Sequence, residues 1–121
     1  MPGNLLAVAI GGALGASARY LLGLLPVKPQ GGFPLITFLI NVAGAFAIGL
    51  IAAASAKNTS VDPRVILFLK VGICGGFTTF STFSMETVNL LQSGRNLTAF
   101  LYIISSVTLG TAAVFAAEKI V

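Results

Sequence analysis

The sequence predicts an all-α membrane protein of four transmembrane helices, the third of which is broken near its middle. Hydrophobic residues make up 56% of the 121 residues and charged residues 8%, whereas soluble domains carry about 25% charged residues. Four apolar stretches have the roughly 20 residues that a helix needs to cross a bilayer. The third stretch contains a glycine and threonine run that disfavours a continuous helix.

Short polar or proline-containing connections separate these stretches, so the chain is expected to form a single transmembrane domain over 1–121. The connections leave no room for a further domain outside the membrane. The expected helices cover about 4–25, 33–56, 64–92 with a break near 75–79, and 97–117.

The basic residues of short loops usually set the orientation of a membrane protein. Here they are evenly divided between the two ends of the predicted bundle: Lys57, Arg64 and Lys119 at the end with the termini, and Arg19, Lys28 and Arg95 at the other. Two interpretations remain open. Either the chain inserts in both orientations and forms an antiparallel dual-topology homodimer, or its orientation is weakly biased by features other than the loop charges.

The residue inventory argues against an enzyme. With no histidine and three Asp and Glu residues in total, the chain cannot build a histidine-based hydrolytic triad or metal site. Cys74 is the only cysteine and cannot form an intrachain disulfide. The basic residues form no patch, so no nucleic-acid partner is expected, and no catalytic cofactor is called for.

Small residues at a spacing of four predict close helix packing in lipid. They occur in three of the expected helices, as the pairs Gly11 and Gly15, Ala45 and Gly49, and Gly72 and Gly76.

The third stretch carries the polar chemistry. An interruption around Gly75 to Thr79 frees carbonyls that suit a cation and amides that suit an anion. Such backbone is tolerated in a bilayer only where protein covers it or where it lines a water-filled cavity.

Aromatic and hydroxyl side chains alternate beyond the glycines. Phe77, Phe80 and Phe83 recur every third residue and predict a stripe; a stripe alone is typical of packing. Its interleaving with Thr78, Thr79, Ser81, Thr82 and Ser84 is not required by packing. Phenyl edges carry partial positive charge, so rings alternating with hydroxyl donors indicate a weakly attractive path for a small anion.

Other polar residues lie at membrane depth. Asn41 is interpreted either as a donor to the ion or as an interhelical hydrogen bond that holds the bundle. Tyr102 and Ser106 share one face of the fourth helix. Arg19 is expected at a mouth, paired with a carbonyl or carboxylate, or extended to the interface, and Glu86 is the one acidic residue within the spans.

Along nearly its whole length the chain resembles the Fluc fluoride channels, also called CrcB proteins. The motifs that carry the resemblance are Gly11-Gly12-Ala13-Leu14-Gly15 with Arg19, Asn41-Val42-Ala43-Gly44, and the run from Gly75 to Ser84 followed by Glu86. The last motif is the most specific.

The resemblance implies an antiparallel homodimer with two fluoride pores. It assigns Phe80 and Phe83 as ring-edge ligands and Arg19 and Glu86 to a vestibule or pore end. Polar pore residues would be Asn41, Thr79, Ser81, Thr82, Tyr102 and Ser106. Backbone carbonyls of Gly75 and Thr78 from both subunits would hold a structural sodium ion. Some relatives have a polar residue where this chain has Gly110, which leaves the length of the polar track open.

The resemblance further implies passive fluoride exit from the cytoplasm, which confers fluoride resistance. The expected location is the plasma membrane of a prokaryote, the inner membrane in a Gram-negative cell, with membrane lipid around the protein.

Two other functions stay open on the residues alone. A small multidrug-type proton-coupled transporter also has four spans and dual topology, but it needs a buried carboxylate in its first helix, which is absent here. A structural membrane subunit would explain the hydrophobicity and the glycines but not the polar break.

Overall fold

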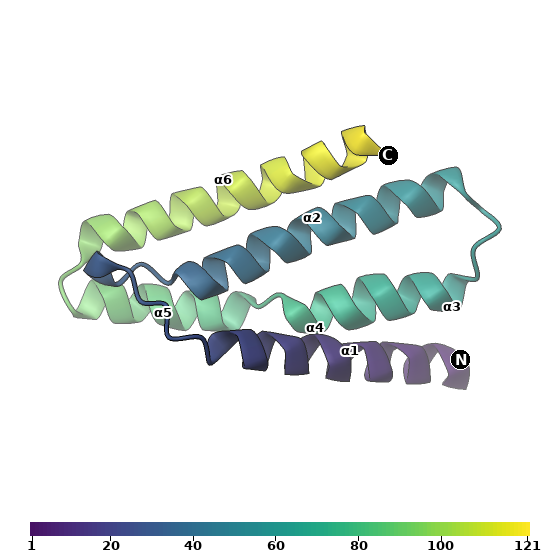
Figure 1. The fold of residues 1–121 in the computed structure, drawn as a ribbon, viewed down its shortest axis with the longest axis horizontal. Coiled ribbons are helices and arrows are strands. Elements are labelled where there is room, and N and C mark those ends of the chain that lie inside the picture. Colours follow the sequence, from purple (N-terminus) through teal and green to yellow (C-terminus); the bar gives the residue numbers. More distant parts are fainter.

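Four long helical segments run antiparallel to one another in chain order in the computed structural model, which describes residues 1–121 (Figure 1). Each is long and apolar enough to cross a membrane, which confirms the predicted number of spans. They are α1 (Pro2–Gly23), α2 (Leu35–Lys57), the third segment (Pro63–Gln92) and α6 (Asn96–Ile120). The largest difference from the expected bounds is at the end of α6, which continues to Ile120 instead of 117.

The third segment consists of several pieces. It begins with α3 (Pro63–Ile66), capped by the Asp62 side chain, and continues as a π-helix over Leu67–Cys74. The short α4 (Gly75–Phe77) precedes the break, and α5 (Phe80–Gln92) follows it. A short 3₁₀ turn, η1 (Gln30–Gly32), lies in the connection from α1 to α2.

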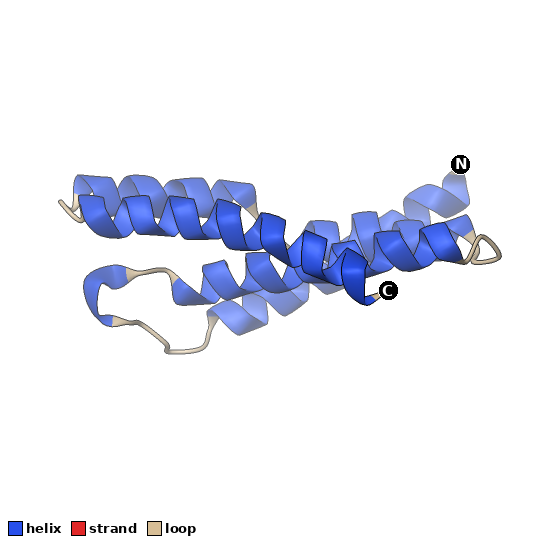
Figure 2. Ribbon diagram, turned by 90° about the horizontal axis from the view of Figure 1, so that it is seen from above, coloured by secondary structure: helices blue, strands red, loops and turns tan.

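The four segments pack as two pairs, and the third segment connects one pair to the other. α2 packs along α6, whereas α1 packs along the π-helix and α4, and α5 contacts α6. Both termini lie at the same end of the bundle (Figure 1), and the view from above shows no strand anywhere in the fold (Figure 2). Only 13 of the 121 residues are buried, so most apolar side chains are at least partly exposed, as lipid contact requires.

Glycines let α1 approach the third segment closely. A Cβ on Gly11 would lie 2.4 Å from the Phe68 carbonyl oxygen, and one on Gly15 would lie 2.2 Å from that of Ile73. From the other side, a Cβ on Gly76 would lie 2.6 Å from the Gly12 carbonyl oxygen. The predicted glycine packing is therefore confirmed, because backbone meets backbone here without side chains between.

The break is shorter than the sequence indicates. Thr78 (φ −83°, ψ 156°) and Thr79 (φ −149°, ψ 124°) are extended, whereas Gly75 to Phe77 remain helical. At Gly76 the absence of a side chain serves the contact with α1. The interruption is therefore confined to the two threonines, Thr78 and Thr79.

Candidate functional site

The Asn41 side chain on α2 bridges the broken backbone. The Thr79 N–H donates to Asn41 Oδ1 at 2.8 Å, and Asn41 Nδ2 donates to the Thr79 carbonyl at 3.1 Å. Of the two interpretations of Asn41, the interhelical hydrogen bond is thus present. A primary amide has two N–H donors, so one Asn41 donor is still free for an ion.

Beyond the break, the first turn of α5 presents amide donors. The Thr79 hydroxyl caps the helix by accepting from the Thr82 N–H at 3.2 Å. The N–H groups of Phe80 and Ser81 have no acceptor in the chain. Such free amides at a helix start, where the helix dipole is positive, favour an anion.

Before the break, carbonyls are free. The Thr78 N–H and hydroxyl both donate to the Cys74 carbonyl, at 3.0 and 2.9 Å. The carbonyls of Gly75 and Thr78 receive no hydrogen bond within the chain. The two sides of the break therefore offer opposite chemistry, oxygen acceptors on one and N–H donors on the other.

A cleft of about 410 Å³ opens beside the break. Many of the predicted site residues line it, including Asn41, Gly75, Thr78, Phe80, Phe83 and Ser106. The Ser106 hydroxyl oxygen is buried and has no hydrogen-bond partner. The cleft thus combines phenyl rings with at least one unused hydroxyl.

Phe80 and Phe83 lie in contact but differ in exposure. Their ring centroids are 5.9 Å apart with planes inclined by 38°. Phe80 is 79% exposed on the outside of the single chain, whereas Phe83 packs against Tyr102 at 4.9 Å. Phe77 belongs to α4, and because Thr78 and Thr79 are extended, the expected stripe does not continue helically from Phe77 to Phe80.

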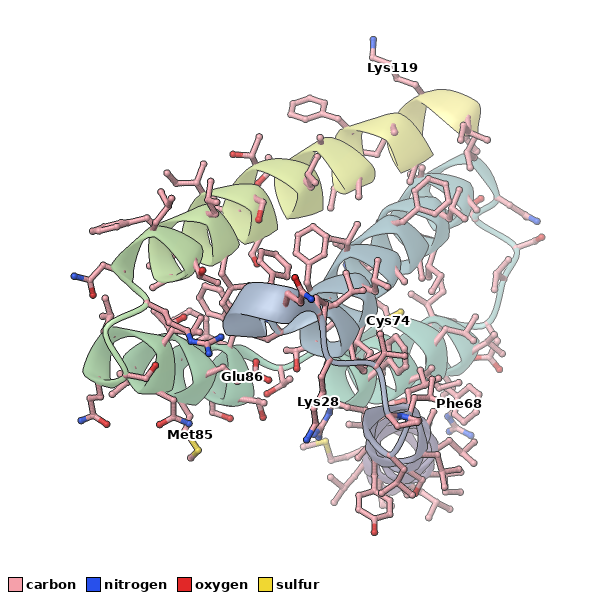
Figure 3. All side chains as sticks on the ribbon, turned by 60° about the vertical axis from the view of Figure 1, so that its left-hand side comes forward. Lys28, Phe68, Cys74, Met85, Glu86 and Lys119 are labelled. Atoms are coloured by element: carbon pink, nitrogen blue, oxygen red, sulfur yellow. The ribbon has the colours of Figure 1, made fainter.

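Glu86 ties three helices together. Its carboxyl group accepts from the Thr37 hydroxyl of α2 at 2.8 Å and from the Tyr102 hydroxyl of α6 at 2.7 Å. Figure 3 shows Glu86 within the bundle and the adjacent Met85 projecting away from it. Tyr102 is fully buried and lines neither the cleft beside the break nor the wider one described next. Its hydroxyl donates a hydrogen bond to Glu86 in this structure.

A wider cleft of about 810 Å³ lies at the end of the bundle opposite the termini. Its lining includes three basic residues and a single acidic one: Arg19, Lys28, Arg95 and Glu86. Arg19 also donates from Nε to the Gly76 carbonyl at 3.1 Å. The excess of positive charge raises the local concentration of anions.

The two clefts share one residue. Thr79 lines both, and Thr82 lines the wider cleft only. Ser81 is exposed, and its hydroxyl lies 3.5 Å from that of Thr79. Thr79, at the start of α5, therefore lies at the boundary between the charged cleft and the phenyl-lined cleft.

Sequence reasoning missed Thr37, the second donor to Glu86. Thr37 lies four residues before Asn41 and therefore on the same face of α2. A hydroxyl at that spacing in an otherwise apolar helix was the available signal. From the sequence, Lys28 and Arg95 were interpreted only as loop residues that influence membrane orientation. In the structure, both line the wider cleft.

Most of the chain matches known proteins of one family. Residues 6–117 match the model of the family described as CrcB-like protein, Camphor Resistance (CrcB). A protein of Nitrobacter winogradskyi named fluoride-specific ion channel FluC is 48% identical over 118 residues, which are 97% of this chain and 94% of that protein. One of the same name from Flavobacterium psychrophilum is 49% identical over 104 residues, 85% of this chain and 84% of that protein.

A third protein of that name, from Anaeromyxobacter dehalogenans, is 43% identical over 119 residues, 98% of this chain and 94% of that protein. With its four spans and bacterial relatives, the chain is a multi-pass protein of the prokaryotic plasma membrane. The similarity covers both glycine-rich α1 and the broken third segment, and the chain belongs to the CrcB family.

Proposed function

We propose that this protein is a fluoride-specific ion channel through which fluoride leaves the cytoplasm down its electrochemical gradient. The observation that carries the proposal is the break at Thr78 and Thr79, where free N–H groups of Phe80 and Ser81 lie beside a cleft lined by two phenyl rings. The chain's relatives bear the name of such a channel.

The chemistry of this path suits a small, strongly hydrated anion. Amide and hydroxyl donors replace water one at a time, and phenyl edges add weak positive potential without a fixed charge. Of the two clefts only the wider one is lined by basic side chains, which attract the anion before it reaches the smaller cleft. An ion that meets no fixed cation inside is free to leave.

Proton-coupled drug export is disfavoured by the carboxyl groups. α1 contains no acidic residue, and the Glu86 carboxyl group, which lines the wider cleft, is already held by two hydroxyl donors. A structural subunit would have no use for the unpaired donors at the break.

We further propose that the working unit is an antiparallel homodimer. The break carries free carbonyls and amides, and Gly75, Phe80 and Ser81 are exposed in the single chain. Because hydrocarbon offers no hydrogen-bond partners to such groups, we expect a second copy of the chain to cover them. Tags on both termini should be labelled from both faces of the membrane, and one-sided labelling would rule out the antiparallel arrangement.

A structural sodium ion fits the same surface. The carbonyls of Gly75 and Thr78 receive no hydrogen bond, and Gly75 is exposed in the single chain. Unwound backbone carbonyls at a broken helix are suitable sodium ligands. Two carbonyls from each of two copies would hold the ion and so join the subunits.

Fluoride efflux from liposomes that contain only this protein tests the function. With potassium permeability supplied by valinomycin, we expect rapid fluoride release and little chloride release under matched gradients. Fluoride retention, or chloride release at the same rate, would contradict the proposal.

A further inference from the structure

We infer that Gly44 is a positioning residue whose missing side chain seats Thr78 and thereby fixes the backbone of the break. Gly44 is buried on α2, one turn after Asn41, and lines the smaller cleft together with Thr78. α2 therefore contacts both extended residues, Thr79 through the Asn41 amide and Thr78 through Gly44.

The contact at Gly44 leaves no space for a methyl group. A Cβ built there would lie 2.2 Å from Thr78 Cγ2 and 3.4 Å from Phe77 Cδ2. The obstructing atom is the methyl of a β-branched side chain, which has few allowed χ1 angles. A flexible side chain could move aside easily, and Thr78 cannot.

The Thr78 side chain is also fixed from the other side. Its hydroxyl donates to the Cys74 carbonyl at 2.9 Å. Rotation about χ1 to move the methyl away from α2 would swing the hydroxyl off Cys74. A side chain at position 44 must therefore either break that bond or push the Thr78 backbone away from α2.

Moving the Thr78 backbone would redirect its carbonyl, one of the proposed sodium ligands. This consequence rests on the proposed function, whereas the steric relation between Gly44 and Thr78 does not. We expect Gly44→Ala to lower fluoride flux at least about tenfold, because overpacking forces side chains and backbone to shift, and to raise the sodium concentration needed for half-maximal flux.

Thr78→Ser provides the decisive background, because serine keeps the hydroxyl and the carbonyl but lacks the obstructing methyl. In that background Gly44→Ala should change flux, sodium requirement and dimer yield less than about twofold relative to Thr78→Ser alone. Gly12→Ala is the matched control, since a Cβ at Gly12 would meet nothing within 4 Å.

Each outcome decides the inference. Loss of flux in the wild-type background with recovery in the Thr78→Ser background supports it, including the case in which Gly44→Ala alone does not fold but the double variant does. Wild-type behaviour of Gly44→Ala overturns it, as does equal damage in both backgrounds. Failure of the proposed function would look different, because the unmodified protein itself would then release no fluoride.

Discussion

Asn41 and Thr79 exchange two hydrogen bonds, although they lie 38 positions apart and on different helices. In a continuous helix, the N–H and the carbonyl of Thr79 would bond to residues one turn away. Here both groups bond to the Asn41 side-chain amide instead. A single side chain thus stabilises an extended residue in the middle of a membrane span, where an unsatisfied peptide group is costly.

Asn41→Asp should lower fluoride efflux from liposomes by about tenfold or more. A carboxylate still accepts from the Thr79 N–H but cannot donate to its carbonyl, a loss of roughly 1–3 kcal/mol for a buried group. Its negative charge would also repel the anion. Asn58→Asp is the control, because Asn58 lies in a loop and its side chain only accepts hydrogen bonds there. Equal efflux from both variants would show that Asn41 lies off the ion path.

Phe80→Ile and Phe83→Ile should each reduce fluoride efflux severalfold or more while dimers still form. Isoleucine fills space but has no ring edge with partial positive charge. Phe115→Ile is the matched control, since Phe115 is exposed on α6 and lines neither cleft. Wild-type efflux from both pore variants would contradict the assigned lining.

Tyr102→Phe should lower the thermal denaturation midpoint measured in detergent. It removes the donor at 2.7 Å from Glu86, and an unsatisfied buried acceptor costs roughly 1–3 kcal/mol. Tyr20→Phe is the control, because Tyr20 is 66% exposed. An unchanged midpoint in Tyr102→Phe would mean that the bond to Glu86 contributes nothing to stability.

Gly11→Ala should destabilise the fold by about 1–3 kcal/mol through overpacking, because its Cβ would lie 2.4 Å from a backbone carbonyl that cannot move aside. Gly12→Ala adds the same methyl one position later, where nothing lies within 4 Å. Thermal denaturation of the two variants in the same detergent separates packing from helix propensity. Equal shifts in the two would show that the close approach has no energetic role.

Replacing Lys28 and Arg95 together by glutamine should slow fluoride efflux severalfold at about 10 mM salt. The effect should shrink at about 150 mM, where the screening length falls to roughly 8 Å. Lys57 and Lys119, which line neither cleft, form the control pair. A reduction that is the same at both salt concentrations would indicate a structural effect instead of attraction.

Local patterns account for what the sequence predicted well. Apolar length alone located the four spans, and the spacing of Gly11, Gly15, Gly72 and Gly76 predicted that helices pack closely at these residues. The break was placed too broadly because glycine disfavours a helix and also permits close packing, and only the neighbouring helix decides between these roles. At Gly76 the neighbour is α1, so the helix continues.

Contacts between distant segments could not be read from local spacing. The Asn41 partner, the Thr37 bond to Glu86 and the sharing of Thr79 by both clefts depend on the register of α2 against the third segment. The Phe77, Phe80 and Phe83 spacing was interpreted on one continuous helix, and the two extended threonines removed that assumption.

The exposed break has a consequence for biogenesis. A newly inserted chain carries the unpaired carbonyls of Gly75 and Thr78 at its lipid boundary until something covers them. Each such group is costly in hydrocarbon, so under the proposed homodimer a solitary copy would be an incompletely assembled species. The rate of encounter between copies, and not the folding of each one, would then limit how quickly a cell accumulates the finished protein.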